Sequence, residues 1–299
     1  MTKLIIGTRG SKLALWQAHY TLDKLTEAGV EAELKIIKTK GDKIQHLSFD
    51  KIEGKGFFTK EIEDALLQGE IDMAVHSMKD MPTAQPEGLA LAAVSYRENP
   101  ADWLFVRKDV ANPKSGLKLQ ENAIVGTSSA RRKAQLLAIQ PDIQIKDIRG
   151  NVPTRLQKLR EGQFDAIMLA AAGVSRLELD VSDFEVVKFE PKHFVPAPAQ
   201  GVLAFQIREE DKLLRKTLQI LHSSDVVKCT NVERTVLKMM DGGCQMPLGV
   251  YCERDHMGYY HAWGAKAENW DAPVRRSHVS SSTYVGLAEK VYDQLMNEA

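Results

Sequence analysis

The chain has 299 residues, which is enough for two or three domains of ordinary size. Its 40 Lys and Arg residues balance its 40 Asp and Glu residues, so no global charge favours nucleic acid or an anionic membrane as a partner. No apolar run approaches the ~20 residues of a membrane span, and the one near the N-terminus is too short for a signal peptide.

The first part of the chain alternates apolar runs with stretches of helical spacing, which predicts an α/β lobe. We predict strands at 3–8, 33–39, 71–77, 89–96 and 102–109, and helices at 11–29 and 59–69. The polar, glycine-rich stretch between the second strand and the second helix is more typical of a loop than of a linker. ENP at 98–100 is a candidate hinge.

Two short patterns occur twice and in the same order. IGTRGS (6–11) and VGTSS (125–129) each lead from a strand into a helix. GEIDMAVH (69–76) and GQFDAIML (162–169) each lead from the end of a helix into a strand. The shared order predicts two α/β lobes of like topology, which would bind a ligand in the cleft between them, at helix N-termini.

The boundaries follow from this comparison and from a change of pattern near the C-terminus. The first lobe should cover 1–98 plus about 200–218, the second lobe 99–194, and a smaller α+β domain 220–299. PAPAQGVLAFQI (196–207) predicts a crossing segment followed by a strand. We predict helices at 209–222, 224–240 and 283–297, and strands at 248–253 and 259–266.

Basic residues gather where predicted strands lead into helices. Arg9 precedes the first helix, while Arg131, Arg132 and Lys133 occupy the first turn of the matching helix. DIRGNVPTR adds Arg149 and Arg155 at another such turn, and Arg176 and Lys55 are further candidates. Cations at a helix N-terminus oppose the helix dipole, so their repeated presence suggests a site for carboxylates or phosphates. The alternative is a solvated face on which these arginines pair with nearby acids.

Asp80 and Cys244 are the other candidates for chemistry. Asp80 follows an apolar strand and precedes Met-Pro, so it either sets the turn or serves as a carboxylate at the carboxyl end of a strand. Cys244 follows two glycines in DGGCQMP, and it is either an inert small side chain or a thiol on a protruding loop. We expect His76, in the apolar strand before Asp80, to face the core.

The remaining cysteines and histidines predict no metal site. Cys229, Cys244 and Cys252 form no CxxC pair, and the eight histidines have no obvious metal-ligand spacing. An odd number of cysteines without an export signal favours free thiols in the cytoplasm.

Eight segments together resemble one family, the hydroxymethylbilane synthases, also called porphobilinogen deaminases. They occur in the family's order between residue 6 and about residue 249: GTRGSKLALWQ, GKGFFTKEIE, DMAVHSMKDMP, IVGTSSARRKAQL, IRGNVPTRLQKL, FDAIMLAAAGVSRL, AQGVLAFQ and GGCQMPLG. The resemblance implies two lobes like those of type II periplasmic binding proteins plus a small α+β third domain. It also implies a monomeric transferase that joins four porphobilinogen molecules head to tail and releases ammonia each time.

The resemblance further implies a dipyrromethane cofactor held by a thioether to Cys244, and it assigns roles to individual residues. Asp80 matches the catalytic aspartate, which would stabilise the cation left when ammonia departs. The residues implied to bind the cofactor are Ser77, Lys79, Thr127, Ser128, Ser129, Arg131, Arg132, Gly150 and Gln200. Those implied to bind the substrate are Arg9, Ser11, Gln17, Lys55, Phe58, Arg149, Arg155 and Arg176.

The chain departs from the family's usual pattern at a few positions. Pro198 and Ala199 precede Gln200 where a glycine is usual, Gln206 stands where a glutamate is usual, and Lys12 is not the commonest residue at its position. These departures bear on the geometry of the crossing segment and on any ion pair made from position 206.

Two other functions fit parts of the pattern. A two-lobed anion receptor without turnover would share the architecture, but the third domain and Cys244 argue against it. A DNA-binding regulator could use such lobes as a sensor, although no helix-turn-helix or basic tail supports it. Either protein would carry no covalent pyrrole adduct.

Overall fold

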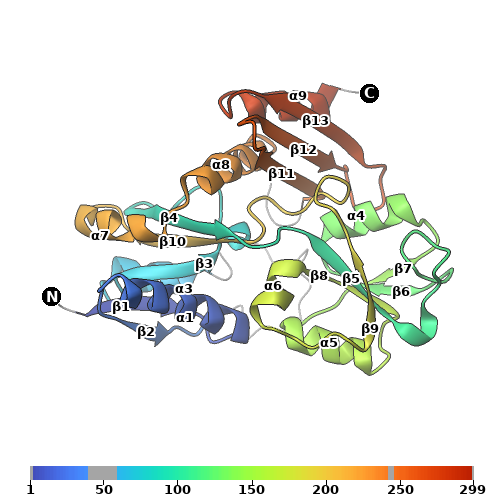
Figure 1. Ribbon diagram of the computed structural model, residues 1–299, viewed down its shortest axis with the longest axis horizontal. Helices are drawn as coiled ribbons and strands as arrows, with labels where there is room; N and C mark the ends of the chain where they lie inside the picture. The colour runs from blue at the N-terminus through green and yellow to red at the C-terminus, as the bar shows by residue number, and fades with distance from the viewer. Residues whose placement is uncertain (1–2, 40–58, 242–245, 298–299) are drawn as a thin grey trace. The chain divides into compact units, whose positions relative to one another are not determined.

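A computed structural model describes residues 3–39, 59–241 and 246–297 (Figure 1). The chain forms two compact units. Of the described residues, the first unit holds 3–39, 59–98 and 201–227, and the second holds 99–200, 228–241 and 246–297.

The first unit is built on one five-stranded sheet of order β2-β1-β3-β10-β4. Its strands are β1 (Leu4–Thr8), β2 (Ala32–Ile36), β3 (Met73–Ser77), β4 (Leu89–Arg97) and β10 (Val202–Arg208). Its helices are α1 (Lys12–Glu27), α3 (Lys60–Leu67) and α7 (Lys212–Thr217), with 3₁₀ turns η2 (Met78–Asp80) and η4 (Leu218–Leu221). β1 pairs in parallel with β2 and β3, whereas β10 runs antiparallel between β3 and β4.

Strand β3 shows why this sheet is covered on both faces. Met73 and Val75 pack with Leu25 of α1 on one side, and Ala74 packs with Ile62 and other α3 residues on the opposite side. Successive side chains of a strand point to opposite faces, so a continuous apolar run needs a layer on each. The buried strand predicted at 71–77 is therefore confirmed.

The second unit contains a sheet of the same topology, with order β7-β6-β8-β5-β9. Its strands are β5 (Asp102–Arg107), β6 (Ile124–Gly126), β7 (Gln144–Lys146), β8 (Ala166–Ala170) and β9 (Phe184–Lys188). Its helices are α4 (Ala130–Ile139), α5 (Val152–Arg160) and α6 (Ala171–Arg176), with a 3₁₀ turn η3 (Lys108–Val110). β5, like β10, runs antiparallel beside the parallel strands. The two type II binding-protein-like lobes expected from the sequence are thus present.

The repeated G-x-x-D pattern has the same structural role in both sheets. Asp72 Oδ2 accepts a hydrogen bond from Ile5 N at 2.8 Å, and Asp165 Oδ2 accepts one from Ile124 N at 2.7 Å. In each case the aspartate's own N–H donates back to the same partner's carbonyl oxygen at 2.9 Å. The aspartate thus joins β3 to β1 in the first lobe and β8 to β6 in the second.

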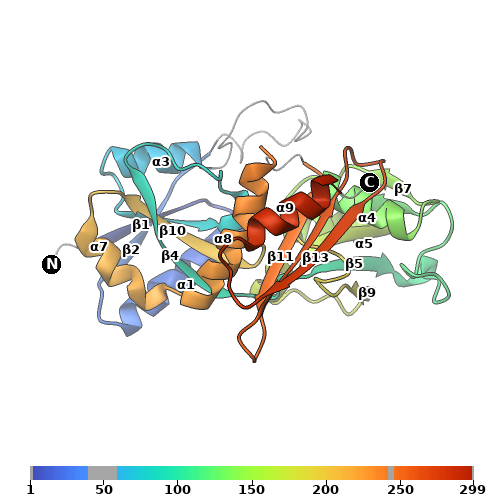
Figure 2. The same ribbon diagram turned by 90° about the horizontal axis from the view of Figure 1, so that it is seen from above.

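The C-terminal residues of the second unit form a separate three-stranded sheet of order β11-β12-β13. Its strands are β11 (Leu248–Arg254), β12 (Tyr260–Lys266) and β13 (Arg275–Ser281). The helices of this region are α9 (Leu287–Asn297) and α8 (Ser224–Met239), whose first four residues belong to the first unit. Apolar side chains of α8 and α9 pack together with those of β11 and β12. Figure 2 shows the ribbon of α9 beside this sheet. This is the α+β region expected near the C-terminus. Strand β13 was not predicted, because RRSHVSS has one apolar residue, Val279.

The crossing segment before β10 packs against this C-terminal sheet. Val250 N donates to Pro196 O at 3.1 Å, and a Cβ at Gly249 would lie 2.4 Å from Val195 O. Ala199, which stands where the family usually has glycine, has a φ of 61°. Ala199 therefore adopts a left-handed backbone conformation, which favours glycine.

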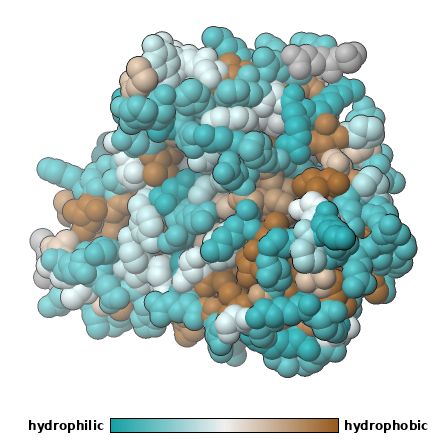
Figure 3. Space-filling model, turned by 45° about the vertical axis from the view of Figure 1, so that its right-hand side comes forward, coloured by the Kyte–Doolittle hydropathy of each residue, from teal (hydrophilic) through white to brown (hydrophobic). Residues whose placement is uncertain are grey.

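The surface carries a mixture of polar and apolar side chains. The face drawn in Figure 3 is mostly hydrophilic, with smaller apolar areas between the polar ones. In the part of the chain that the structure describes, no helix is long and apolar enough to span a membrane.

Candidate functional site

In the first unit, the predicted site residues lie at the carboxyl ends of β1 and β3. Ser11 caps α1, because its side-chain oxygen accepts a hydrogen bond from Ala14 N at 3.2 Å. The half-buried Arg9 lies in the short loop between β1 and this cap. Gln17, which is buried within α1, donates from Nε2 to Ser77 Oγ at 2.8 Å. The structure thus joins Gln17 and Ser77, which lie 60 residues apart in the sequence.

The turn after β3 carries the candidate catalytic carboxylate. Met78–Asp80 form one turn of 3₁₀ helix, closed by a hydrogen bond from Met81 N to Met78 O at 3.2 Å. Met78 is buried, Lys79 is half-buried and Asp80 is exposed. His76 is buried, as expected from the sequence. The apolar strand therefore anchors a turn that presents Asp80 to solvent at the carboxyl edge of the sheet.

In the second unit, three hydroxyl residues shape the loop before α4. Ser129 caps the helix by accepting from Arg132 N at 3.4 Å, and Thr127 Oγ1 accepts from Ser129 N at 3.3 Å. Ser128 Oγ both donates to Ile148 O at 2.9 Å and accepts from Ile148 N at 3.1 Å. These bonds fix the loop and tie it to the segment that leads to α5.

Arg131 and Arg132 share one buried carboxylate. Asp102, which is 0% exposed, accepts from Arg131 Nη1 at 2.7 Å through Oδ2. Its Oδ1 accepts from Arg132 Nη2 at 2.7 Å and from Arg132 Nε at 3.1 Å. Both guanidinium groups also donate to backbone carbonyls, of Val195 and Met168. The alternative of a solvated arginine face is therefore wrong for these two residues, although they do pair with an acid.

The carboxyl group of Asp102 is ionised in the folded protein. Burial alone would raise the pKa of its carboxyl, but the charges and hydrogen bonds of Arg131 and Arg132 hold that pKa well below its ordinary value. One carboxylate cannot neutralise two guanidinium groups, so the trio retains a positive charge. Arg131 Nε is also buried without a hydrogen-bond partner among the described residues.

Further positive charge lies at the turn before α5. Gly150 has a φ of 112°, and a Cβ there would meet the Thr154 side chain at 2.7 Å, so the position requires glycine. Arg155 Nε donates to Gly150 O at 2.8 Å. Burial, together with the charges of Arg132 and Arg149, lowers the pKa of Arg155 to about 10. Arg132 and Arg149 thus lie close enough to Arg155 to act on its charge, and such an arginine cluster fits a ligand bearing several carboxylates.

Gln200 joins this cluster through Asp102. Its Nε2 donates to Pro100 O at 2.7 Å and to Asp102 Oδ1 at 3.0 Å. Arg176 is buried at the end of α6. Asp102 itself was not singled out from the sequence. The available signal was an acid at the start of an otherwise apolar strand, DWLFVR.

Three predicted site residues, Lys55, Phe58 and Cys244, lie outside the described residues. Among the described residues, no cluster of His, Cys, Asp or Glu is suited to hold a metal ion.

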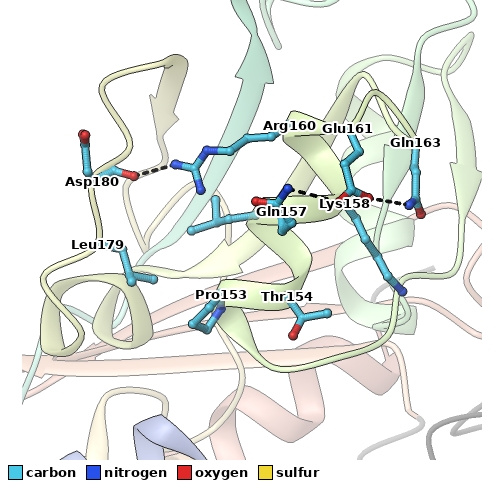
Figure 4. A pocket seen from close by; sticks show the side chains of 10 residues that line it. Pro153, Thr154, Gln157, Lys158, Arg160, Glu161, Gln163, Leu179 and Asp180 are labelled. Atoms are coloured by element: carbon cyan, nitrogen blue, oxygen red, sulfur yellow. Dashed lines mark hydrogen bonds between the residues drawn. The ribbon is translucent and has the colours of Figure 1, made fainter.

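A surface pocket of about 610 Å³ lies over α5 and contains none of the predicted site residues. Its rim is crossed by hydrogen bonds from Arg160 Nη2 to Asp180 O and from Gln157 Nε2 to Glu161 Oε1, drawn in Figure 4. Its charged side chains are of both signs, Lys158 and Arg160 against Glu161 and Asp180. It therefore lacks the excess of positive charge found in the arginine cluster.

Known proteins with similar sequences identify the family. The family model for the dipyrromethane cofactor-binding domain of porphobilinogen deaminase matches residues 4–216, and the model for that enzyme's C-terminal domain matches residues 227–259. The chain belongs to the porphobilinogen deaminase family. Porphobilinogen deaminase of Oceanobacillus iheyensis is 46% identical over 257 residues, which are 85% of this chain and 82% of that protein. The Bacillus cereus enzyme is 47% identical over 253 residues, 84% of this chain and 80% of its own.

The chain was also compared with solved structures. A periplasmic substrate-binding protein from Coxiella burnetii gives a TM-score of 0.42 at 14% identity, covering 75% of this chain and 94% of its own. The assignment of the two lobes therefore rests on the strand orders of the two sheets and on the porphobilinogen deaminase family.

Proposed function

We propose that this protein is a hydroxymethylbilane synthase, which joins four porphobilinogen molecules into the linear tetrapyrrole hydroxymethylbilane and releases ammonia at each addition. The match to the porphobilinogen deaminase cofactor-binding domain over residues 4–216 is the observation that carries this function. The arginine cluster of the second unit supports it, because each pyrrole of substrate or cofactor bears an acetate and a propionate.

The residues of the second unit fit a dipyrromethane cofactor. A buried group of arginines, neutralised only in part by Asp102, is suited to bind the cofactor's four carboxylates, and charged hydrogen bonds contribute roughly 1.5–3 kcal/mol each. When bound, the dipyrromethane would supply the nucleophilic pyrrole carbon on which the product grows. The residues that we propose to bind the cofactor are Arg131, Arg132, Thr127, Ser128, Ser129, Gly150 and Gln200 of the second unit and Ser77 and Lys79 of the first. Cys244 is the proposed point of attachment of the cofactor.

Asp80 has the environment that its proposed role requires. Its exposed carboxylate, held on a short turn, can accept a hydrogen bond from the pyrrole N–H of porphobilinogen. As the C–N bond breaks, the electron pair leaves with ammonia and positive charge develops on the substrate, which Asp80 would stabilise. The new C–C bond forms at the substrate carbon that carried the amino group, and a proton is lost from the attacking pyrrole. The residues that we propose to bind the substrate are Arg9, Ser11, Gln17, Lys55, Phe58, Arg149, Arg155 and Arg176.

We also propose three domains, at 1–98 with about 200–218, at 99–194 and at 220–299, and a monomer that acts in the cytoplasm. The resemblance to the family supports both proposals. Light scattering during size-exclusion chromatography would test the monomer, and cell fractionation would test the location.

Intact-mass spectrometry under denaturing conditions tests the function. Protein from a host that makes porphobilinogen should carry an adduct of two linked pyrrole units, which peptide mapping should place on Cys244. The same protein should convert porphobilinogen into a linear tetrapyrrole. An unmodified chain without turnover would contradict the proposal and would favour an anion receptor.

A further inference from the structure

A buried amide lies behind the candidate catalytic turn, outside the set of predicted site residues. Gln206 is 0% exposed and lies in β10 opposite Ala74 of β3. Its Oε1 lies 3.1 Å from His76 Nε2. Its Nε2 donates to Gln85 Oε1 at 2.9 Å and to Glu63 Oε1 at 3.3 Å. One side chain thus connects α3, β3, β10 and the loop after β3.

The orientation of this amide follows from its neighbours. Gln85 Nε2 donates to Pro82 O at 3.4 Å, so Gln85 presents its oxygen to Gln206. Glu63 also presents a carboxylate oxygen, and both oxygens therefore require the NH₂ group of Gln206. Gln206 Oε1 is left facing His76, and a carbonyl oxygen can only accept. The proton of the neutral imidazole must therefore reside on His76 Nε2.

The connections reach both ends of the Met78–Asp80 turn. His76 directly precedes Ser77, the last residue of β3. On the other side, Gln85 contacts the carbonyl of Pro82, which is two residues beyond Asp80. Both His76 and Gln85 form a hydrogen bond with Gln206. The backbone entering the turn and the backbone leaving it are therefore tied to the same buried group.

We propose that Gln206 is a positioning residue, which holds the Met78–Asp80 turn and so fixes the Asp80 carboxylate for the reaction. This inference rests on the proposed function, in which Asp80 acts on the substrate. Gln206 itself is buried and acts through His76 and Gln85.

The electrostatic setting explains why an amide suits this position. Burial, opposed by the hydrogen bond to Gln206 and aided by the charge of Arg9, lowers the pKa of His76 to about 4. His76 is therefore neutral at neutral pH, and the network contains one acidic side chain, Glu63. A glutamate at position 206 would place a second carboxylate beside Glu63, where two like charges repel. It would also offer His76 a negatively charged partner, which favours protonation.

Steady-state kinetics of the holoenzyme would test the proposal with Gln206→Leu and Gln85→Leu. We expect Gln206→Leu to lower kcat about tenfold while KM stays within about twofold, because a displaced catalytic group affects the reaction more than binding. Gln85→Leu removes one arm and should lower kcat about threefold on the same reasoning. Ile207→Ala is the matched control, since Ile207 lies in the same strand opposite Met73, at the far end of β3 from the turn. It should weaken the sheet and leave kcat unchanged.

Gln206→Glu supplies a readout that a purely structural role would not change. The variant should raise the pKa of His76, measured by ¹⁵N NMR of its ring, and shift the acid limb of the kcat profile upward. In the parent protein the same spectra should show the proton on Nε2.

The outcomes separate this inference from the proposed function. If the parent enzyme makes hydroxymethylbilane and both leucine variants retain its kcat, Gln206 has no positioning role. If Gln206→Leu does not fold, the Gln85→Leu variant decides. A parent protein that makes no tetrapyrrole would instead remove the proposed function.

Discussion

The two lobe sheets have the same strand order but bury different kinds of polar group in the same strand. In the second unit, the antiparallel strand β5 begins with Asp102, an ionised carboxylate opposite Ala170 at the end of β8. In the first unit, the corresponding strand β10 carries Gln206, a neutral amide opposite Ala74, the second residue of β3. The topology is shared, whereas the charge and the depth of the polar group differ.

This difference matches the work that we propose for each sheet. Arg131 and Arg132 must remain charged and fixed before any anionic ligand arrives, and a buried carboxylate achieves both. The turn after β3 needs position rather than charge, and the neutral amide of Gln206 supplies it by holding His76 and Gln85. The same fold can therefore accommodate an electrostatic site in one copy and a mechanical support in the other.

The largest expected effect is that of Asp102→Asn, which removes the buried negative charge of the second unit. The variant leaves two buried guanidinium groups without a counter-charge, and breaking such a buried pair costs about 3–5 kcal/mol. Urea denaturation would measure the loss. Asp183→Asn is the control, because its ion pair with Arg160 is exposed and should contribute less than about 1 kcal/mol. Equal small losses in both variants would show that Asp102 does not neutralise the arginines.

A smaller effect is the pH dependence of stability that His76 causes in the first unit. The pKa of His76 is lowered to about 4 in the folded protein, so its neutral form is favoured by folding. Its contribution to stability is complete above the unfolded value of about 6.5 and is lost as the pH falls toward 4, by up to about 3 kcal/mol.

Denaturation midpoints measured between pH 7 and pH 4 would record this loss, and His76→Gln should flatten it. Asp102 adds little to the loss in this window, because the stability gained from its lowered pKa is lost mainly below the ordinary carboxyl pKa of about 4 in the unfolded chain. An unchanged pH dependence in His76→Gln would show that His76 is not buried in a neutral state.

The smallest expected effect distinguishes the two segments that cross between the units. The crossing at 199–201 needs left-handed backbone at Ala199 and Gly201, with φ values of 61° and 91°, whereas no described residue from 97 to 101 has a positive φ. Ala199→Gly should raise the stability by about 0.5–1 kcal/mol, because glycine adopts this conformation without strain. Ala288→Gly in helix α9 is the control and should lower stability by about 1 kcal/mol. Calorimetric melting would measure both changes in stability. A loss of stability in Ala199→Gly would contradict a strained backbone at Ala199.

The sequence predicted the parts that depend on local pattern. The apolar run at 71–77 placed β3, and helical spacing placed α1. The match of VGTSS to IGTRGS indicated α4, and the paired aspartates of G-x-x-D indicated two like lobes. Strand β13 was missed because its polar sequence becomes a strand only by pairing with β12. Apolar periodicity carries no signal for such a strand.

The polar networks could not be predicted in the same way. Asp102 meets its arginines 29 and 30 positions later in the chain, and Gln206 meets His76 across 130 positions. Periodicity and spacing describe neighbours along the chain, so they place residues on elements but not against each other. The sequence therefore identified the arginines as a set and did not show that a buried acid already holds two of them.

The proposed role of the arginine cluster is tested most directly by the mass of the protein after Arg131→Leu and Arg132→Leu. Each variant, expressed beside Lys133→Leu, should show a reduced fraction of chains carrying the two-pyrrole adduct on Cys244. Lys133 is the matched control, since it occupies the same first turn of α4 and pairs instead with Asp147 at 2.8 Å. Full occupancy of Cys244 in both arginine variants would contradict the anchoring role on which the account depends.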